Sequence, residues 1–348
     1  MIVNEKTIQA LEPLLETFTQ TTVLITGATG MIGQNLIAIL LAMNDELNAN
    51  IHLIAHVRNE VKADRLFRKY SDRPDFEVII SDVNELKVEG NVDYIIHTAG
   101  VTGGSKQHID YPMRTISTAL DGTKNVLDIA VEKNCKGVVY LSSLEVYGNS
   151  GLSSKDIYET DGGYIDPTNV RSSYSESKRM CECICASYTK QFGISTYIAR
   201  LTATFGYGVA YTDNRVFAQF ARSIIEKKDI ILKSTGETVR NYCDAEDAAT
   251  AILILLAKGE PGTAYNVANM DTEISIKDLA EKFIERFPEN NISLKFDLKE
   301  DVAELGYNTV MRNVLNSNKL MSLGWKPVFD MQDMIKRLVD SMMTFSKE

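Results

Sequence analysis

The sequence has little of what marks secreted, membrane or nucleic-acid-binding proteins. Its 348 residues include five cysteines, an odd number, so we do not expect a disulfide scaffold. No apolar run reaches the roughly 18 residues of a membrane span, and the first 21 residues lack the basic and apolar regions of a signal peptide. Acidic residues outnumber basic ones by 47 to 37, whereas phosphate-rich surfaces attract basic proteins. We expect a globular cytoplasmic protein without nucleic-acid or membrane partners.

Three of the cysteines alternate along the chain. On a helix, Cys181 and Cys185 share a face while Cys183 points elsewhere. No neighbouring histidine completes a zinc set. The pattern therefore predicts small buried side chains and no metal site.

The chain is organised around residues 23–33, where an apolar run meets three glycines at three-residue spacing and then a helical pattern. Gly27 lets the chain leave a strand sharply, Gly30 lets backbone N–H groups approach a pyrophosphate, and Gly33 lets a helix pack closely. Because a helix N-terminus attracts anions, the stretch predicts a dinucleotide site. The same spacing also occurs in ordinary turns, so the prediction depends on its context. The expected contacts are Gly27, Thr29, Gly30, Met31, Ile32 and Gly33.

Strand and helix patterns alternate after this turn. A leading helix is expected at residues 4–18 and further helices at 31–43 and 112–133, while the apolar strands lie at 50–57, 76–80, 93–97 and 137–141. Five strands alternating with helices are typical of an α/β fold, a Rossmann-type doubly wound parallel sheet.

Residues at the strand ends bear on the cofactor. A carboxylate after the second strand would accept from an adenosine ribose, whereas an arginine suits a 2′-phosphate. Arg58 stands at this position, which favours NADP. Alternatively, Arg58 is a solvated surface charge and other residues hold the ribose of NAD, so the choice between NAD and NADP is left open. Asp82 either accepts from the adenine amino group or caps the next turn. Further expected contacts are Val83, Thr98, Ala99 and Gly100, and His97 is expected to be structural.

Three residue types with acid–base chemistry follow. The fifth strand ends in Ser142 and Ser143, and Tyr174 and Lys178 are four apart on one helical face. The lysine cation is expected to lower the tyrosine pKa from its usual value of about 10. Such a tyrosine can take a proton from a sugar hydroxyl while the carbon gives hydride to a nicotinamide. Ser143 would orient the reacting oxygen.

The segments TGATGMIG, SSLEVYG and YSESK together resemble the extended short-chain dehydrogenase/reductase family, specifically its nucleotide-sugar epimerases, dehydratases and decarboxylases. The resemblance covers about residues 20–340. It implies that Ser143, Tyr174 and Lys178 form a catalytic triad, with Tyr174 and Lys178 also touching the cofactor. It implies a leading helix over 1–20, an NAD(P)-binding domain over 21–202 and a smaller α/β substrate domain over 203–348, with the chain returning to the body around 240–267.

The resemblance also concerns the substrate and the assembly. Residues 214–217 and 236–247 are similar to the family's nucleotide-diphosphate contacts, which makes Arg240, and less strongly Arg215 and Arg312, candidates for the diphosphate of a nucleotide-diphosphate sugar. Family members commonly pair two helices from each subunit. A homodimer through helices 112–133 and 174–192 is implied.

Departures from the family pattern limit which of the family's reactions this chain is expected to catalyse. Ala203 and Ala119 each stand where the family usually has an asparagine, which puts in doubt a substrate contact and a backbone-supporting bond, respectively. Hexose dehydratases carry an Asp-Glu pair after the serine or threonine, but here the pair is Leu144 and Glu145. The missing aspartate disfavours 4,6-dehydration, whereas a single glutamate also occurs in UDP-glucuronate decarboxylases. Glu145 is therefore a further catalytic candidate.

The sequence favours 4-epimerisation through transient oxidation at C4. The alternatives are decarboxylation of a uronate, one-way reduction of a 4-keto sugar, 4,6-dehydration, and a redox-silent sensor that binds dinucleotide without turnover. Neither the sugar nor the nucleotide can be named from the sequence.

Overall fold

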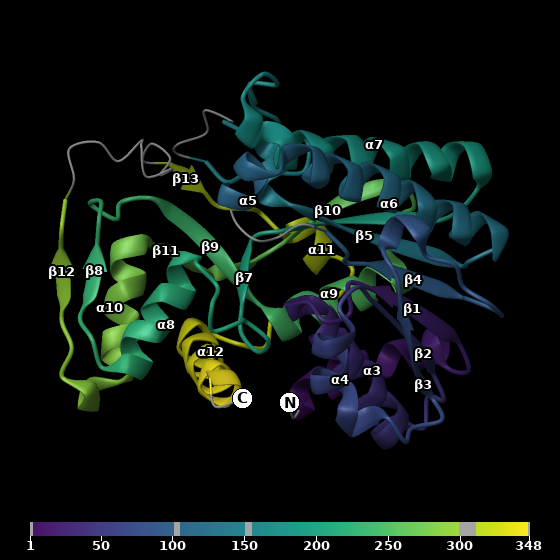
Figure 1. Ribbon diagram of the computed structural model, residues 1–348, viewed down its shortest axis with the longest axis horizontal. Coiled ribbons are helices and arrows are strands. Elements are labelled where there is room, and N and C mark those ends of the chain that lie inside the picture. The colour runs from purple at the N-terminus through teal and green to yellow at the C-terminus, as the bar shows by residue number, and fades with distance from the viewer. Residues whose placement is uncertain (1–2, 101–104, 150–154, 299–310, 347–348) are drawn as a thin grey trace.

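The computed structural model describes residues 3–100, 105–149, 155–298 and 311–346 (Figure 1). Within these ranges the centre of the molecule is a seven-stranded parallel sheet, in the order β10-β6-β5-β4-β1-β2-β3. The predicted Rossmann-type sheet is confirmed, and two strands are added at one edge. The strands are β1 (Thr22–Thr26), β2 (His52–Val57), β3 (Phe76–Ile80), β4 (Tyr94–His97), β5 (Gly137–Ser143), β6 (Thr196–Leu201) and β10 (Thr263–Val267).

Helices cover both faces of this sheet because its strands are apolar on both sides. On one face lie α3 (Met31–Leu47), α4 (Glu60–Phe67) and α9 (Ala245–Lys258), which share one core with the leading helices α1 (Glu5–Leu11) and α2 (Leu15–Phe18). On the other face α6 (Pro112–Glu132) and α7 (Ser173–Phe192) lie side by side (Figure 1). Cys181 and Cys185 are buried in this second core and Cys183 is exposed, as the helical spacing predicts.

A second lobe has its own apolar core. A four-stranded sheet joins β7 (Ala203–Phe205), β9 (Val239–Asp244), β11 (Asn269–Ser275) and β13 (Arg312–Asn313), and β8 (Ile230–Leu232) pairs with β12 (Leu294–Phe296). The helices α8 (Val216–Glu226), α10 (Ile276–Arg286) and α12 (Met331–Ser346) pack together at its centre. The short helices α5 (Ser105–Asp110) and α11 (Asn318–Met321) lie in connections. In the described ranges no helix is both long and apolar enough to cross a membrane.

The strand order reverses between β1 and β4, so the connections diverge at the carboxyl ends of these strands. Ligands of open α/β sheets bind at such a point. The glycine turn after β1 and the serine at the end of β5 therefore lie at the same edge of the sheet.

Candidate active site

The glycine turn after β1 leaves room only for backbone. Gly27 has φ of +67°, and a Cβ there would lie 2.8 Å from the backbone of Ala99. A Cβ on Gly33 would lie 2.7 Å from Ala28. α3 begins at Met31 with Gly30 at its N-cap and no side-chain cap, so its first N–H groups are left for a ligand. This cradle fits the pyrophosphate of a dinucleotide.

The other predicted cofactor residues surround this turn. Thr98 Oγ1 donates to the carbonyl of Thr26 at 2.7 Å, which fixes the chain leading to Ala99 and Gly100 beside Gly27. Asp82 accepts from the N–H of Asn84 at 3.1 Å and so caps the next turn, the second of the two roles considered for it. Val83 is buried against α6. Arg58 follows β2 and is exposed. Thr29, Met31 and Ile32 lie within the turn and the first turn of α3.

His97 is structural, as predicted. Its two ring nitrogens lie 2.7 Å from Thr26 Oγ1 and 3.1 Å from Thr123 Oγ1. Burial lowers the pKa of His97 to about 3, so the ring is neutral. It ties β4 to β1 and α6 beneath the cofactor turn.

Ser143, Tyr174 and Lys178 come together at the carboxyl end of β5. Ser143 ends that strand and its side chain shares a hydrogen bond with Tyr174, the second residue of α7. Lys178 lies one turn further on, with Nζ 5.8 Å from the centre of the Tyr174 ring. A Cβ on Gly100 would lie 3.9 Å from Lys178 Nζ. The three residues thus adjoin the loop 98–100, which is predicted to contact the cofactor.

The expected lowering of the Tyr174 pKa by Lys178 was wrong for this structure. Burial raises the pKa of Tyr174 to about 12, and its hydrogen bond with Ser143 and the charge of Arg215 offset this only in part. The carboxylate of Glu145 raises it further. Lys178 donates to the carbonyl of Leu141 at 2.6 Å, and burial lowers its own pKa to about 8. The free-energy cost of burying a phenolate away from water exceeds its stabilisation by nearby positive charge, so the pKa of the tyrosine rises.

His108 on α5 was not identified from the sequence. Its ring stacks on that of Tyr174, with centroids 4.6 Å apart and planes at 26°. Its Nδ1 lies 3.1 Å from Thr115 Oγ1 on α6, and burial lowers the pKa of His108. No motif surrounds this residue, so no sequence signal could have placed it there. The stack fixes the plane of the tyrosine ring.

The three arginines predicted for the substrate differ in their partners. Among the described residues, Arg240 Nε on β9 is buried without a hydrogen-bond partner. Arg215 pairs with Asp213 at 2.7 Å and still acts electrostatically on Tyr174. Arg312 pairs with both Glu273 and Asp156 at 2.8 Å, although its Nη1 is unpartnered. Arg240 therefore has the most binding capacity free for a diphosphate.

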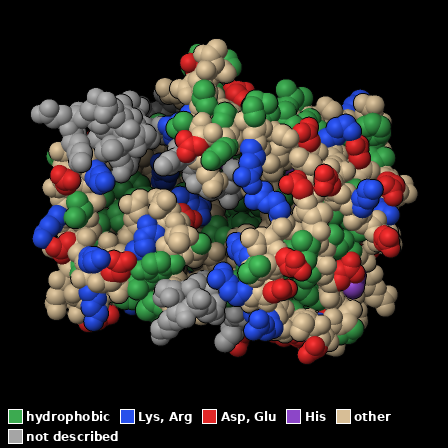
Figure 2. Space-filling view, viewed as in Figure 1, with side chains coloured by type: hydrophobic (Ala, Val, Ile, Leu, Met, Phe, Trp, Pro, Cys, Tyr) green, Lys and Arg blue, Asp and Glu red, His purple; other side chains and the backbone are tan. Residues whose placement is uncertain are grey.

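The surface between the two lobes is hollowed, and Lys and Arg side chains border the hollow (Figure 2). Glu145 is exposed, directly after the 3₁₀ turn begins at Leu144. Ala119 lines a small enclosed cavity beside Tyr174 and Lys178. Ala203 lies in β7, paired with Tyr242 of β9.

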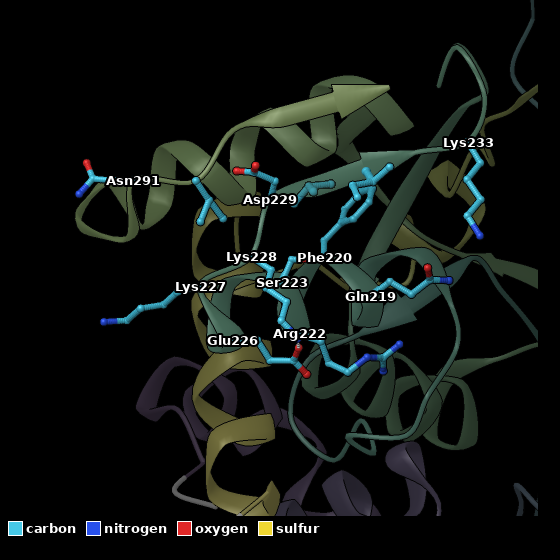
Figure 3. Close-up of a pocket in the computed structure, with 13 residues that line it drawn as sticks. Gln219, Phe220, Arg222, Ser223, Glu226, Lys227, Lys228, Asp229, Lys233 and Asn291 are labelled. Carbon is cyan, nitrogen blue, oxygen red and sulfur yellow. Dashed lines mark hydrogen bonds and ion pairs between the residues drawn. The ribbon is translucent and has the colours of Figure 1, made fainter. Parts of the chain in front are cut away.

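A second depression lies on the smaller lobe. It is wide, about 710 Å³, and contains none of the predicted site residues. Figure 3 shows its side chains spread around an open surface on α8, β8 and the segment before β12. Arg222 lines this depression, and its Nη1 donates hydrogen bonds to the carbonyls of Tyr211 and Asp213. The depression carries no constellation of catalytic groups.

Comparisons with known proteins agree with this geometry. UDP-glucuronic acid decarboxylase 6 of Arabidopsis thaliana is 30% identical over 297 residues, which cover 82% of this chain and 83% of that protein. dTDP-D-glucose 4,6-dehydratase of Mus musculus is 26% identical and covers 91% of this chain and 87% of its own. A UDP-N-acetylglucosamine 4-epimerase from Methanobrevibacter ruminantium M1 shares the fold, with a TM-score of 0.79, 18% identity and coverage of 94% of this chain and 99% of that one. Residues 23–268 match the NAD dependent epimerase/dehydratase family, and the chain belongs to that family of enzymes.

Proposed function

We propose that the protein oxidises the sugar of a nucleotide-diphosphate sugar at C4 and then returns the hydride, with net 4-epimerisation. The observation that carries this proposal is the meeting of Ser143, Tyr174 and Lys178 beside the uncapped N-terminus of α3. When bound, the oxidised dinucleotide supplies the hydride acceptor. The residues of the glycine turn and the loop 98–100 would hold it.

Each residue of the triad has a distinct task. In its ionised form, Tyr174 would take the proton of the C4 hydroxyl as the same carbon gives up hydride, so the sugar becomes a 4-ketone. Ser143 holds that oxygen through its hydroxyl. Lys178, charged below a pKa of about 8, would hold a ribose hydroxyl. Return of the hydride to the other face of the ketone and of the proton from Tyr174 completes the epimerisation.

The second lobe, which is formed mainly by residues 203–348 but excludes α9 and β10 of the large sheet, would bind the substrate. Arg240 fits the diphosphate because its buried Nε lacks a hydrogen-bond partner among the described residues, and Arg215 adds charge near Tyr174. We further propose a cytoplasmic homodimer formed through the outer faces of α6 and α7. Those helices carry the exposed apolar side chains Met113, Met180 and Phe192.

Decarboxylation is the second candidate. The carboxylate of Glu145 is exposed and raises the pKa of Tyr174, and one relative at 30% identity is a UDP-glucuronic acid decarboxylase. In this reaction the 4-ketone formed from a uronate would lose carbon dioxide before the hydride returns. Substituting Glu145 by glutamine should then suppress the product and spare substrate binding.

The test is mass spectrometry of the products formed from UDP-, dTDP-, GDP- and CDP-sugars, with NAD, NADP or NADPH supplied separately. A product of unchanged mass and altered retention supports 4-epimerisation. Loss of carbon dioxide from a uronate supports the second candidate. Stoichiometric consumption of NADPH would show one-way reduction of a 4-keto sugar, and absence of turnover across the panel would contradict the proposal.

A further inference from the structure

The segment that joins β7 to α8, residues 206–215, ends in Arg215. This residue precedes the first turn of α8, and its charge partly offsets the rise that burial causes in the pKa of Tyr174. Its guanidinium pairs with Asp213 at 2.7 Å and lies 4.7 Å from the centre of the Phe217 ring. Because Asp213 belongs to the same segment, that ion pair cannot fix the backbone of the segment relative to the rest of the protein. Contacts with other elements must hold it.

The first half of the β7–α8 segment packs on α3, the helix that follows the cofactor turn. Asn35 of α3 donates to the carbonyl of Tyr207 at 3.0 Å. Gly208 has φ of +92°, and a Cβ there would lie 3.3 Å from the Cα of Met31. The N–H of Gly208 also donates to Ser341 Oγ on α12 at 3.0 Å. The segment therefore leaves the cofactor helix at a fixed place.

The second half of the β7–α8 segment is held by side chains of α8. Gln219 and Arg222 are three residues apart and lie on one face of this helix (Figure 3). Arg222 Nη1 donates to two backbone carbonyls, those of Tyr211 and Asp213. Gln219 Nε2 donates to the carbonyl of Asn214 at 2.7 Å. These hydrogen bonds tie the backbone immediately before Arg215 to the helix that follows it.

Arg222 makes the strongest of these contacts. The hydrogen bond of Gln219 is exposed to solvent, as is the bond that Tyr211 donates to Glu226 at 2.8 Å. The two hydrogen bonds of Arg222 are partly buried and come from a charged donor. A hydrogen bond from a charged group contributes more than one between neutral groups. Removing the Arg222 guanidinium should therefore release residues 211–213 from α8.

We propose that Arg222 is a positioning residue for the substrate site: it clamps the backbone of residues 211–213 to α8 and so keeps Arg215 where its charge meets the phosphates of the substrate. Arg222 acts through Arg215. The inference rests on the proposed function in that the site binds a nucleoside diphosphate, and it is independent of which sugar reaction follows.

A double-mutant cycle tests the clamp without turnover. UDP, dTDP, GDP and CDP are titrated into the wild type by calorimetry, and the one that binds most tightly is used for the variants. Arg222→Met keeps most of the aliphatic chain and removes both hydrogen bonds. We expect Arg222→Met and Arg215→Ala each to weaken binding about threefold, as the loss of a partly exposed charge contact does. The double variant should bind no more weakly than Arg215→Ala alone.

Two outcomes of this cycle would overturn the proposal. One is an unchanged affinity in Arg222→Met, and the other is additive losses in the double variant, which would mean that Arg222 does not act through Arg215. Lys233→Met is the matched control, because Lys233 lines the same depression as Arg222 from the end of β8. It should leave the affinity within about 1.5-fold, and a loss equal to that of Arg222→Met would show a general effect of charge and contradict the clamp.

Turnover of a sugar nucleotide that the wild type converts gives a second readout. Arg222→Met and Arg215→Ala should change KM and kcat by the same factors, because both changes act on one guanidinium. A change in kcat in Arg222→Met that Arg215→Ala does not share would contradict the proposal. If the wild type turns over no sugar nucleotide, the proposed function fails, and the binding cycle still decides the role of Arg222.

Discussion

Arg337 on α12 joins the two lobes through buried carboxylates. Its Nε lies 3.2 Å from Asp244 Oδ2 and its Nη2 lies 2.5 Å from Glu246 Oε2, and neither carboxylate side chain is exposed to solvent. Asp244 ends β9 and caps α9, while Glu246 also accepts from Asn4 and Thr7 near the N-terminus. Replacing Arg337 by methionine keeps the packing on Phe329 and removes the charge.

The expected loss follows from leaving buried charges unpaired. Removing one partner of a buried pair costs about 3–5 kcal/mol. Glu246 keeps its hydrogen bonds from two neutral donors. We therefore expect the free energy of unfolding to fall by about 3 kcal/mol, near the lower end of this range. At about 2–3 °C per kcal/mol for a chain of this size, Tm should fall by about 6–9 °C.

The loss of stability caused by Arg337→Met should increase as the pH rises. Burial raises the pKa of Asp244 to about 6 although the charge of Arg337 lowers it. Its usual value is about 3.9, so the folded protein keeps this proton longer than the unfolded chain, and ionisation lowers stability as pH rises from about 4 to 6. Without Arg337 the Asp244 pKa rises further, which extends the penalty above pH 6.

Thermal unfolding of wild type and Arg337→Met at pH 5 and pH 8 measures both effects. The difference in Tm should be larger at pH 8. Lys336→Met is the matched control, because the pair that Lys336 forms with Asp340 is exposed and its loss should change Tm by about 1 °C or less. A Tm for Arg337→Met within 2 °C of wild type at pH 8, or a larger difference at pH 5, would refute the reasoning.

Three further predictions concern the site. Arg240→Ala should weaken UDP binding, measured by calorimetry, by about tenfold or more, because a charge-assisted contact is lost. Arg215→Ala should weaken UDP binding less, because it removes a side chain that is already paired with Asp213. Equal effects of the two variants would contradict the assignment of Arg240 to the diphosphate. His108→Phe should keep the stack on Tyr174 and retain kcat within about threefold, while His108→Ala should lower kcat about tenfold at unchanged KM, and equal rates for both variants would show that the stack does not position the ring. The kcat/KM of the wild type should fall above about pH 8 as Lys178 loses its proton, and in Lys178→Arg, which stays charged, the remaining activity should lack this alkaline limb.

The strands and the main helices could be predicted because their signals are local. The apolar runs that become β1 to β5, and the glycine spacing before α3, depend on neighbours within a few residues. The leading segment is less regular than expected, since Pro13 in a 3₁₀ turn separates α1 from α2. The proposed triad is implied by the family resemblance of its motifs, and the spacing of those motifs is also local: a serine at a strand end, and a tyrosine four residues before a lysine on one helix face.

What the sequence could not show depends on contacts between distant residues. The stack of His108 on Tyr174 needs α5 to fold back on α7, and no periodicity encodes that. The Tyr174 pKa was misjudged because the extent of burial is a tertiary property, whereas the Tyr174–Lys178 spacing is local. The Arg337 cluster likewise joins residues more than 90 positions apart.

The central claim is that Tyr174 is the base in an oxidation at C4. The most direct test is steady-state turnover of Tyr174→Phe on a sugar nucleotide that the wild type converts, with UDP affinity measured alongside. The variant keeps the ring that stacks on His108 and loses only the hydroxyl. Our account predicts that the kcat of Tyr174→Phe falls by about 10²-fold or more, while its UDP affinity stays within about threefold of the wild type. The control variant Tyr70→Phe, on the far edge of the sheet, should change neither quantity. Near-normal turnover by Tyr174→Phe would contradict it.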